Sequence, residues 1–299
     1  MLEPIFRGYL ADPQLIQVPE GYIIYGSPDP ARRQRSFEAL FSPDLAQWSS
    51  LGDVLIPPSA ELGDDFWAPE VAFEDGRYWM YFSVGHGIAG HHIRVAVAQS
   101  PYGPFIDAGV NLTPHETFAI DAHPFRDGDG NWYLFFARDV VDEPRPGTQL
   151  AVMRLASMTV PMSTASTVLA PYADWQIYER SRAMYGEVYD WHTLEGPSVI
   201  AHDGSYTLFF SGGSWEGEGY GVGTAIAPTP LGPWAPGADC GPHVLSSRNT
   251  GLLGPGHCSV LMLRDGTALI AFHAWNKAMT KRQPYLSSLH WSRGTVALS

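Results

Sequence analysis

The stretch WAPEVAFEDGRYWMYFSV, residues 67–84, is the part of the sequence that decides the fold. An apolar run leads to Asp75-Gly76, and an aromatic-rich run follows. Glycine supplies the positive φ that a tight hairpin turn requires, and β-branched and aromatic residues favour strands. The stretch therefore predicts a β-hairpin with its turn at Asp75-Gly76.

The same pattern occurs five times along the chain. The other copies are DPQLIQVPEGYIIYGS (12–27), DAHPFRDGDGNWYLFFAR (121–138), EGPSVIAHDGSYTLFFSG (195–212) and HCSVLMLRDGTALIAFHAW (257–275). Their predicted turns are Glu20-Gly21, Asp129-Gly130, Asp203-Gly204 and Asp265-Gly266, so successive turns lie 55, 54, 74 and 62 residues apart. Each interval has room for a four-stranded sheet.

This repetition predicts an all-β fold, a five-bladed β-propeller. We expect one catalytic propeller domain over residues 1–299, without a C-terminal β-sandwich accessory domain. A β-sandwich is the alternative, but it would not produce five similar hairpins.

Composition narrows the function classes. The chain is 45% hydrophobic and 16% charged, which suits a buried core, and its formal net charge of −13 argues against a nucleic-acid or anionic-membrane partner.

No apolar run is long enough to span a membrane. No signal peptide is recognisable, which predicts a cytoplasmic protein if the N-terminus is native and a secreted one if a leader was removed. A bridge between Cys240 and Cys258 could form but is not implied.

One position recurs ahead of the turns. Counting back eight residues from each acidic turn residue reaches Asp12, Trp67, Asp121, Glu195 and His257. If the repeats are equivalent, these side chains share one position around the mouth of the central channel. Carboxylates that meet in one pocket raise one another's pKa, which offers folding no obvious gain. Glycoside hydrolysis, in contrast, needs a protonated acid beside an ionised base.

Several blocks of the sequence resemble glycoside hydrolase family 43, five-bladed propellers that act on arabinan, xylan and their side chains. The blocks are ADPQLI, FSPDLAQW, FWAPEVAFEDGRYWMYFSV, FAIDAHPFRDGDGNWYLFF, EGPSVIAHDGSYTLFFSGG, TPLGPW and GPGHCSV, and they extend from near residue 11 to the C-terminal end. The resemblance implies an inverting hydrolase of plant cell-wall pentose polysaccharides or oligosaccharides, specifically an exo-acting α-L-arabinofuranosidase. A β-xylosidase and an endo-arabinanase are the enzymatic alternatives, and a carbohydrate-binding propeller without turnover is the non-enzymatic one.

The resemblance also implies roles for the three carboxylates. Asp12 would be the general base that activates water, and Glu195 the general acid that protonates the departing oxygen. Asp121 would orient Glu195 and keep its pKa high. Inversion calls for about 6.5–9.5 Å between base and acid. Asp12 could instead be a turn-forming Asp-Pro, although the repeat favours catalysis.

The remaining expectations concern sugar binding and cations. Trp67 would line the subsite of the non-reducing sugar, although it could be a core residue, and Trp191 is expected in the pocket wall. Arg282 would bind substrate hydroxyls, with a plain surface charge as the alternative. His257 is also expected among the substrate-binding residues, at the channel centre. No cofactor is required, but a structural Ca²⁺ or other cation could lie near His257, bound through waters; otherwise His257 is a buried structural histidine. The role of His123, in IDAHPF, is left open.

Overall fold

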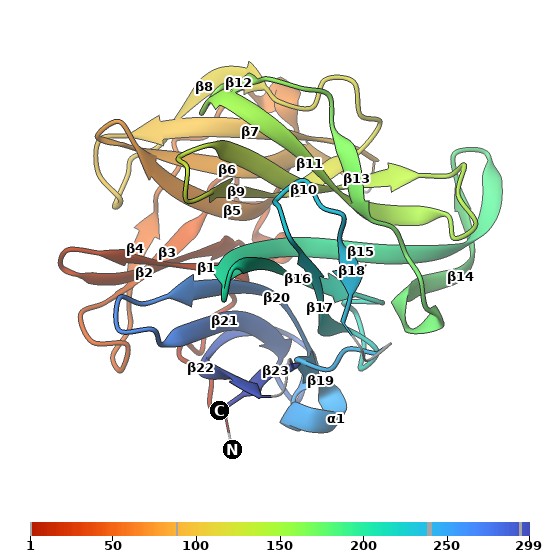
Figure 1. Cartoon of the computed structure of the whole chain (residues 1–299). Coiled ribbons are helices and arrows are strands. Elements are labelled where there is room, and N and C mark those ends of the chain that lie inside the picture. Colours follow the sequence, from red (N-terminus) through yellow and green to blue (C-terminus); the bar gives the residue numbers. More distant parts are fainter. Residues whose placement is uncertain (1, 88, 238–240, 293–294) are drawn as a thin grey trace.

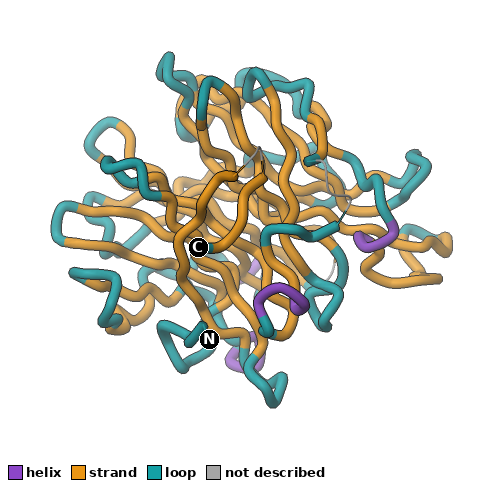
Figure 2. The backbone as a smooth tube through the Cα atoms, turned by 60° about the horizontal axis from the view of Figure 1, so that its bottom comes forward, coloured by secondary structure: helices purple, strands orange, loops and turns teal. Residues whose placement is uncertain are grey.

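The computed structural model describes residues 2–87, 89–237, 241–292 and 295–299, and strands make up most of them (Figures 1 and 2). The first strands of five successive hairpins surround one axis. Each contacts the next, and the last contacts the first, in the cycle β1, β5, β9, β15, β20. This closed cycle confirms the predicted five-bladed propeller.

The blades are antiparallel sheets built mainly from strands in chain order. Blade 1 consists of β1 (Ala11–Val18), β2 (Gly21–Ser27), β3 (Glu38–Ser42) and β4 (Ser49–Asp53). Blade 2 consists of β5 (Asp65–Glu74), β6 (Arg77–His86), β7 (Ala89–Ala98) and β8 (Ile106–Asn111). Blade 3 consists of β9 (Ala119–Arg126), β10 (Trp132–Val140), β11 (Gly147–Ser157) and the short β12 (Val160–Pro161) and β13 (Ser166–Leu169).

The last two blades follow the same plan. Blade 4 consists of β15 (Glu187–His202), β16 (Ser205–Gly212), β17 (Gly221–Ala227) and the short β18 (Ala235–Pro236) and β19 (Leu245–Ser246). Blade 5 consists of β20 (Leu253–Met262), β21 (Ala268–Trp275), β22 (Arg282–Ser292) and β23 (Thr295–Leu298). The helical elements are single turns in loops, namely η1 (Pro30–Arg32), η2 (Ala60–Leu62), η3 (Asp174–Gln176) and α1 (Ser247–Thr250). No helix among the described residues has the length and apolar character to cross a membrane.

In blades 2 to 5 the predicted turn residues lie between the first and second strand, whereas in blade 1 Glu20 does and Gly21 is already the first residue of β2. Asp75 and Gly76 have φ values of 52° and 73°, as a two-residue hairpin turn of this hand requires. In blades 3 and 5 the connection is longer, residues 127–131 and 263–267. There Gly130 and Gly266, both with φ 87°, supply the left-handed residue near the end of the loop.

Blades 3 and 4 are joined, which the prediction of separate four-stranded sheets did not include. β11 runs parallel to β15, with Gly147 opposite His192 and Thr148 opposite Thr193, so the two blades form one 11-stranded sheet. This close approach needs glycine, because a Cβ on Gly147 would lie 2.0 Å from the His192 carbonyl oxygen.

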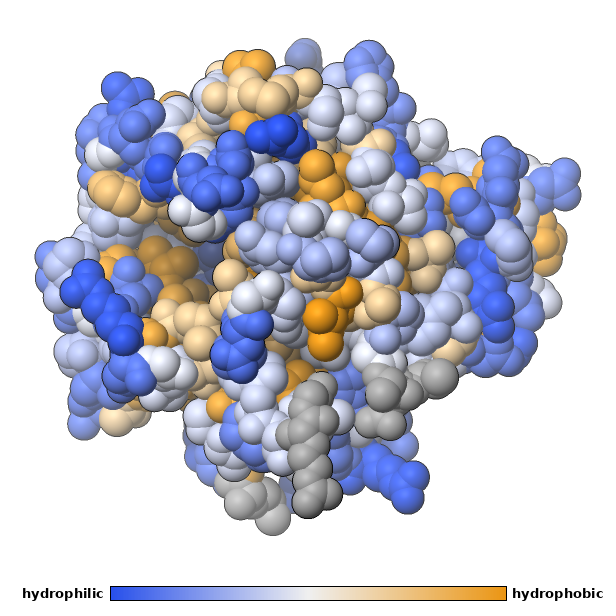
Figure 3. Space-filling view, viewed as in Figure 1, coloured by the Kyte–Doolittle hydropathy of each residue, from blue (hydrophilic) through white to orange (hydrophobic). Residues whose placement is uncertain are grey.

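A hairpin projects from this joined sheet. It consists of β14 (Ile177–Met184) and the outer part of β15, and it extends to the right of the body in Figure 1. In the same view, the surface there is mainly hydrophilic with small hydrophobic spots (Figure 3). Val188, which is 65% exposed, lies on this hairpin.

Hydrophobic clusters fill the spaces between blades. Phe209 of blade 4 and Phe272 of blade 5, for example, are fully buried in one cluster. Cys258 is buried in the same cluster and has no disulfide partner among the described residues; Cys240 lies outside them. The joint between blades 5 and 1 is reinforced by the N-terminal segment, because the N–H groups of Ile5 and Leu10 donate to carbonyls of β22.

Candidate active site

Each first strand carries a β-bulge at the channel mouth. The register between first and second strand slips there in every blade. The bulged residues all have positive φ: Asp12 (50°), Ala68 (46°), Asp121 (59°), Gly196 (55°) and His257 (47°). Bulges re-aim side chains, and aspartate tolerates this backbone region better than most residues. This repeated bulge brings Asp12, Asp121 and His257 together.

The prediction that Trp67 and Glu195 share this position is wrong. Each precedes the bulged residue of its strand, which is Ala68 or Gly196. The eight-residue count fails because the acidic residue has no fixed place in the turns. Asp75 directly follows its strand, as does the acidic residue of blade 4, whereas it is the second turn residue in blade 1 and the third in blades 3 and 5.

Asp12 is a buried carboxylate surrounded by donors. Ser27 Oγ donates to its Oδ2 at 2.5 Å, and Arg282 Nη1 donates to its Oδ1 at 3.3 Å. His257 Nδ1 lies 3.4 Å from the same Oδ1. Burial disfavours the charged form, but His257 and Arg282 outweigh it and hold the pKa of Asp12 well below its usual value. Asp12 is therefore ionised at neutral pH.

Glu195 is the opposite case. Burial, and after it the Asp121 carboxylate, raises the pKa of Glu195 to about 7. Burial also raises the pKa of Asp121. Tyr220 Oη donates to Glu195 Oε1 at 2.6 Å, and the Gly196 N–H donates to Asp121 Oδ2 at 3.0 Å. Near neutral pH a substantial fraction of Glu195 keeps its proton while Asp12 does not, which is the division of labour that acid–base catalysis needs.

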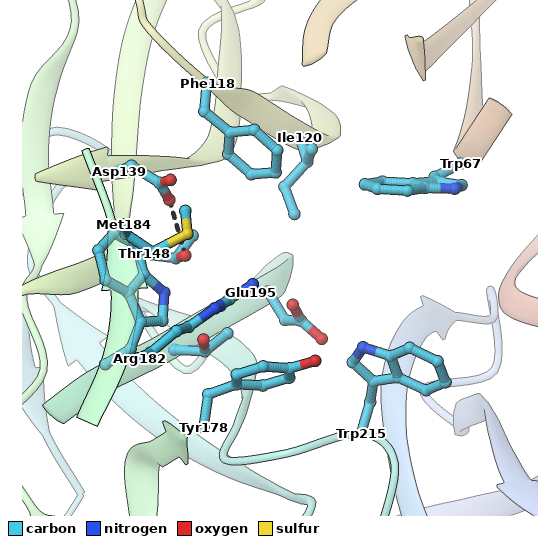
Figure 4. A pocket seen from close by; sticks show the side chains of 12 residues that line it. Trp67, Phe118, Ile120, Asp139, Thr148, Tyr178, Arg182, Met184, Glu195 and Trp215 are labelled. Atoms are coloured by element: carbon cyan, nitrogen blue, oxygen red, sulfur yellow. Dashed lines mark hydrogen bonds between the residues drawn. The ribbon is translucent and has the colours of Figure 1, made fainter. Parts of the chain in front are cut away.

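Glu195 also lines a pocket of about 100 Å³ (Figure 4). Trp67 and Trp215 stand on one side of its carboxylate, and Asp139 and Thr148 lie at the opposite end. The other lining residues are Phe118, Ile120, Tyr178, Arg182, Met184, Trp191 and Thr193. Asp12 and Asp121 are not among them, so Glu195 is the carboxyl group that the channel and the pocket share.

The projecting hairpin forms a wall of this pocket. Arg182 of β14 lies over two aromatic rings, 4.7 Å from the Tyr178 centroid and 5.7 Å from the Trp191 centroid. Tyr185, at the hairpin turn, donates to Asp139 Oδ2 at 2.7 Å. The turn is therefore tied to the far end of the pocket.

The residues expected to bind sugar all lie at the channel or the pocket. Trp67 lines the pocket and stacks on His91 with 3.7 Å between ring centroids. Arg282 is no plain surface charge, because it contacts Asp12 and lies 4.5 Å from the Trp215 ring centroid. Trp191 lines the pocket but is only 1% exposed.

A second polar layer links the blades two residues after each bulge. Its members are Gln14, Glu70, His123, Ser198 and Ser259. Their hydrogen bonds across blade boundaries are Val71 N–H to Gln14 Oε1 (2.6 Å), His123 Nδ1 to Glu70 Oε2 (2.7 Å), Val199 N–H to His123 Nε2 (3.0 Å), Val260 N–H to Ser198 Oγ (3.0 Å) and Leu15 N–H to Ser259 Oγ (2.9 Å). Because His123 Nε2 accepts a hydrogen bond from the Val199 N–H, Nδ1 carries the ring proton and donates to Glu70. His123, left open by the sequence, therefore links three blades.

His257 acts as a counter-ion in this geometry, since Nδ1 faces both Asp12 and Asp121, at 3.4 and 3.9 Å. The part of the chain that the structure describes holds no group of three or more His, Cys, Asp or Glu side chains placed to bind a metal ion. A channel cation bound through waters stays a prediction.

Sequence reasoning missed Ser27 and Tyr220, which hold the two key carboxyl groups. A signal for the serine was present, because the aligned hairpins place Ser27, Ser83 and Ser211 at one position of the second strand. No such signal marks Tyr220, which lies in a loop outside the repeats.

The model of "Glycosyl hydrolases family 43" matches residues 1–296 of the chain. Among curated proteins, a β-D-galactofuranosidase of Aspergillus niger is 29% identical over 250 residues, which are 78% of this chain and 65% of that protein. An extracellular exo-α-(1→5)-L-arabinofuranosidase of Streptomyces avermitilis is 25% identical over 284 residues, which are 89% of this chain and 54% of that protein. The chain thus matches only about half to two thirds of the length of these relatives.

Solved structures give the same result for the whole chain. A thermostable family-43 glycoside hydrolase superposes with a TM-score of 0.84 at 26% identity, covering 97% of this chain and 92% of that one. A protein described as an endo-1,4-β-xylanase from Bacteroides thetaiotaomicron superposes with a TM-score of 0.78 at 29% identity, covering 100% and 97%.

Proposed function

This chain belongs to glycosyl hydrolase family 43, and we propose that it is an inverting, exo-acting α-L-arabinofuranosidase that acts on plant cell-wall polysaccharides or oligosaccharides. The observation that carries the proposal is the pairing of an ionised Asp12 with a Glu195 whose pKa is raised to about 7.

In the proposed reaction the sugar to be removed lies over the channel mouth. Asp12 takes a proton from a water molecule, which attacks the anomeric carbon from the face opposite the leaving group. Glu195 gives its proton to the departing oxygen in the same step, so no covalent intermediate forms. Asp121 holds the backbone beside Glu195 and keeps its pKa high.

The proposal of exo action rests on the pocket. The hairpin of residues 177–191 forms one wall of it, and Trp67 and Trp215 stand on another side. A pocket walled by a projecting hairpin favours a terminal sugar over the interior of a polymer. Arabinofuranose is favoured because the two curated relatives described above are named as furanosidases. Activity on β-xylosides is the alternative.

Hydrolysis of nitrophenyl α-L-arabinofuranoside, β-D-xylopyranoside and β-D-galactofuranoside measures the sugar preference, and proton NMR of the first product measures the anomeric outcome. We expect the arabinofuranoside to be the best substrate and the product to be inverted. Release of arabinose alone from linear arabinan would support exo action, whereas longer oligosaccharides would contradict it. Sugar binding without turnover would make the protein a binding module.

The variants Asp12→Asn and Glu195→Gln test the two roles. We expect each to lower kcat about 10²–10⁴-fold, because general acid–base catalysis contributes on that order. A dinitrophenyl leaving group, which needs little protonation, should restore much of the activity of Glu195→Gln and none of that of Asp12→Asn. Glu187→Gln, an exposed carboxylate on the same strand β15, is the control. Unchanged hydrolysis in either site variant would sink the assignment.

A further inference from the structure

One position on the second strand of every blade faces the bulge of the next blade. It pairs with the residue that precedes the bulge in its own blade. The residues at this position are Ser27, Ser83, Ala137, Ser211 and His273. Four of the five have a side chain that can accept a hydrogen bond.

Each of those four side chains accepts a hydrogen bond from the backbone N–H of the bulged residue in the next blade. The bonds are Ala68 N–H to Ser27 (2.7 Å), Asp121 N–H to Ser83 (3.0 Å), His257 N–H to Ser211 (2.7 Å) and Asp12 N–H to His273 (3.0 Å). The fifth N–H, that of Gly196, faces Ala137 and has no such partner. It donates to Asp121 Oδ2 instead, at 3.0 Å.

Blade 1 shows what a hydroxyl at the position of Ala137 would do, because Ser27 carries one at the same position. Ser27 accepts the Ala68 N–H and donates its own proton to Asp12 Oδ2. A hydroxyl therefore stands between that aspartate and the next blade. Asp121 has no such intermediary and contacts the next blade directly, at the peptide that follows Glu195.

We propose that Ala137 is a positioning residue: because it lacks a hydroxyl, the Asp121 carboxylate itself binds the Gly196 N–H and is held close to Glu195. The inference rests on the proposed function for the assignment of Glu195 as the acid. Ala137 does not touch the reacting atoms; it acts through Asp121.

The placement of Asp121 matters because its charge has the largest influence on the pKa of Glu195 after burial. Other groups that interact with Glu195 are Asp12 on β1, His257 on β20, Tyr178 on β14 and Tyr220 in the loop before β17, and the charged Arg182 on β14 and Asp139 on β10 line the same pocket. Of all these groups, Asp121 is the one whose direct bond depends on residue 137. Moving its charge away would make Glu195 easier to ionise.

The variant Ala137→Ser should recreate in blade 3 the arrangement of blade 1, in which a serine hydroxyl lies between the aspartate and the backbone N–H of the next blade. Its hydroxyl should accept the Gly196 N–H and push the carboxylate away by about the width of one oxygen. We expect the basic limb of the kcat/KM profile to shift down by about 0.5 pH unit or more. For an arabinofuranoside with a poor leaving group, kcat should fall about tenfold with little change in KM, and for a dinitrophenyl arabinofuranoside much less. Ala137→Gly is the matched control, because it adds no hydroxyl and should leave the profile unchanged.

A second readout is independent of hydrolysis. The titration of Glu195 can be followed by NMR of carbon-13-labelled glutamate, with Glu195→Gln to assign the signal. Ala137→Ser should lower the midpoint, and the effect should vanish in the Asp121→Asn background. If the wild type hydrolyses no glycoside, the proposed function fails while this titration still tests the positioning role.

Two results would overturn the proposal: an unchanged Glu195 titration in Ala137→Ser, or an equal shift in Ala137→Gly. If Ala137→Ser does not fold, the reverse exchange Ser27→Ala provides the test. Loss of the Ser27 hydroxyl should raise the pKa of Asp12 and shift the acidic limb of the kcat/KM profile to higher pH. An unchanged acidic limb would show that this strand position does not control the aspartates.

Discussion

Asp12 and Glu195 are both carboxyl groups at the channel mouth, yet their surroundings shift their pKa values in opposite directions. Asp12 has His257, His273 and Arg282 as neighbours, and it accepts a hydrogen bond from Ser27. Glu195 has a tyrosine hydroxyl and a nearby aspartate. The chemistry proposed for this site therefore depends on side chains that do not take part in the proton transfers.

The raised pKa of Glu195 predicts that ionisation of this carboxyl group destabilises the folded protein. Unfolding lowers its pKa from about 7 to the ordinary value of 4.5, so the wild type loses stability as pH rises between these values. The variant Glu195→Gln does not show this decrease in stability, because glutamine does not ionise. We expect the variant to match the wild type near pH 4 and to exceed it at pH 8 by up to about 3 kcal/mol in the free energy of unfolding.

Urea unfolding followed by tryptophan fluorescence at both pH values measures this difference. Glu187→Gln, on the exposed part of the same strand, should follow the wild type at both. Equal stability of Glu195→Gln and the wild type at pH 8 would show that the carboxyl group is not destabilised by burial.

At this scale the sequence could nominate the three carboxylates, because each stands in a repeated motif. It could not nominate Ser27 as the donor to Asp12, or Ala137 as the exception, because their roles depend on contacts between blades. The structure brings these partners together from different strands of the repeats.

At the scale of elements, the bulge and the hairpin define the site. A fixed count of eight residues reaches the bulge in blades 1, 3 and 5 but stops one residue short of it in blades 2 and 4, at Trp67 and Glu195, because the acidic residue occupies different places in the turns. Gly196 occupies the bulge of β15 with φ 55°, a backbone conformation that non-glycine residues adopt in the other four bulges. Glycine relieves packing here, because an added Cβ would lie 3.1 Å from the His257 ring.

The joint between β11 and β15 gives a prediction for the hairpin. A side chain at residue 147 would collide with the His192 carbonyl, so Gly147→Ala should force the hairpin base away from blade 3. We expect a loss of about 2 kcal/mol or more in stability and faster hydrogen exchange in residues 177–191. Thermal unfolding and hydrogen-exchange mass spectrometry measure both.

Gly128→Ala is the matched control for this variant, because its added Cβ would meet no atom within 4 Å. It should leave both measurements unchanged. Normal exchange of the hairpin in Gly147→Ala would mean that the parallel bridge does not hold it.

At the scale of the whole molecule, five blades close into a ring, and the first strand of the last blade contacts the first strand of the first. The fivefold repetition of the hairpin motif made the ring predictable from sequence, since a closed propeller leaves no repeat without a neighbour. The fusion of blades 3 and 4 was not predictable, because it depends on one glycine outside the repeated motif. The joint between blades 5 and 1 is held by the N-terminal segment, by side-chain packing and by hydrogen bonds that include Leu15 to Ser259, Asp12 to His273 and Arg282 to Asp12.

This closure gives a prediction for Ser259→Ala. The variant leaves the buried N–H of Leu15 without its acceptor, which costs about 1–3 kcal/mol. We expect one cooperative transition at a lower temperature, measured by calorimetry. Ser205→Ala, whose hydroxyl bonds within its own turn, should change stability little. A separate early transition would show that the blades unfold independently.

Strand β15 is held in place on both sides of Glu195, which bears on how the pocket wall can change among related sequences. The parallel bridge fixes residues 192 and 193, and the bulge fixes Gly196. Between the two lies Glu195, while the hairpin outside the bridge forms the pocket wall. Changes in residues 177–191 can therefore reshape the pocket wall while the backbone on both sides of Glu195 stays anchored, and Tyr178 is a position in this segment at which such a change would also reach the acid.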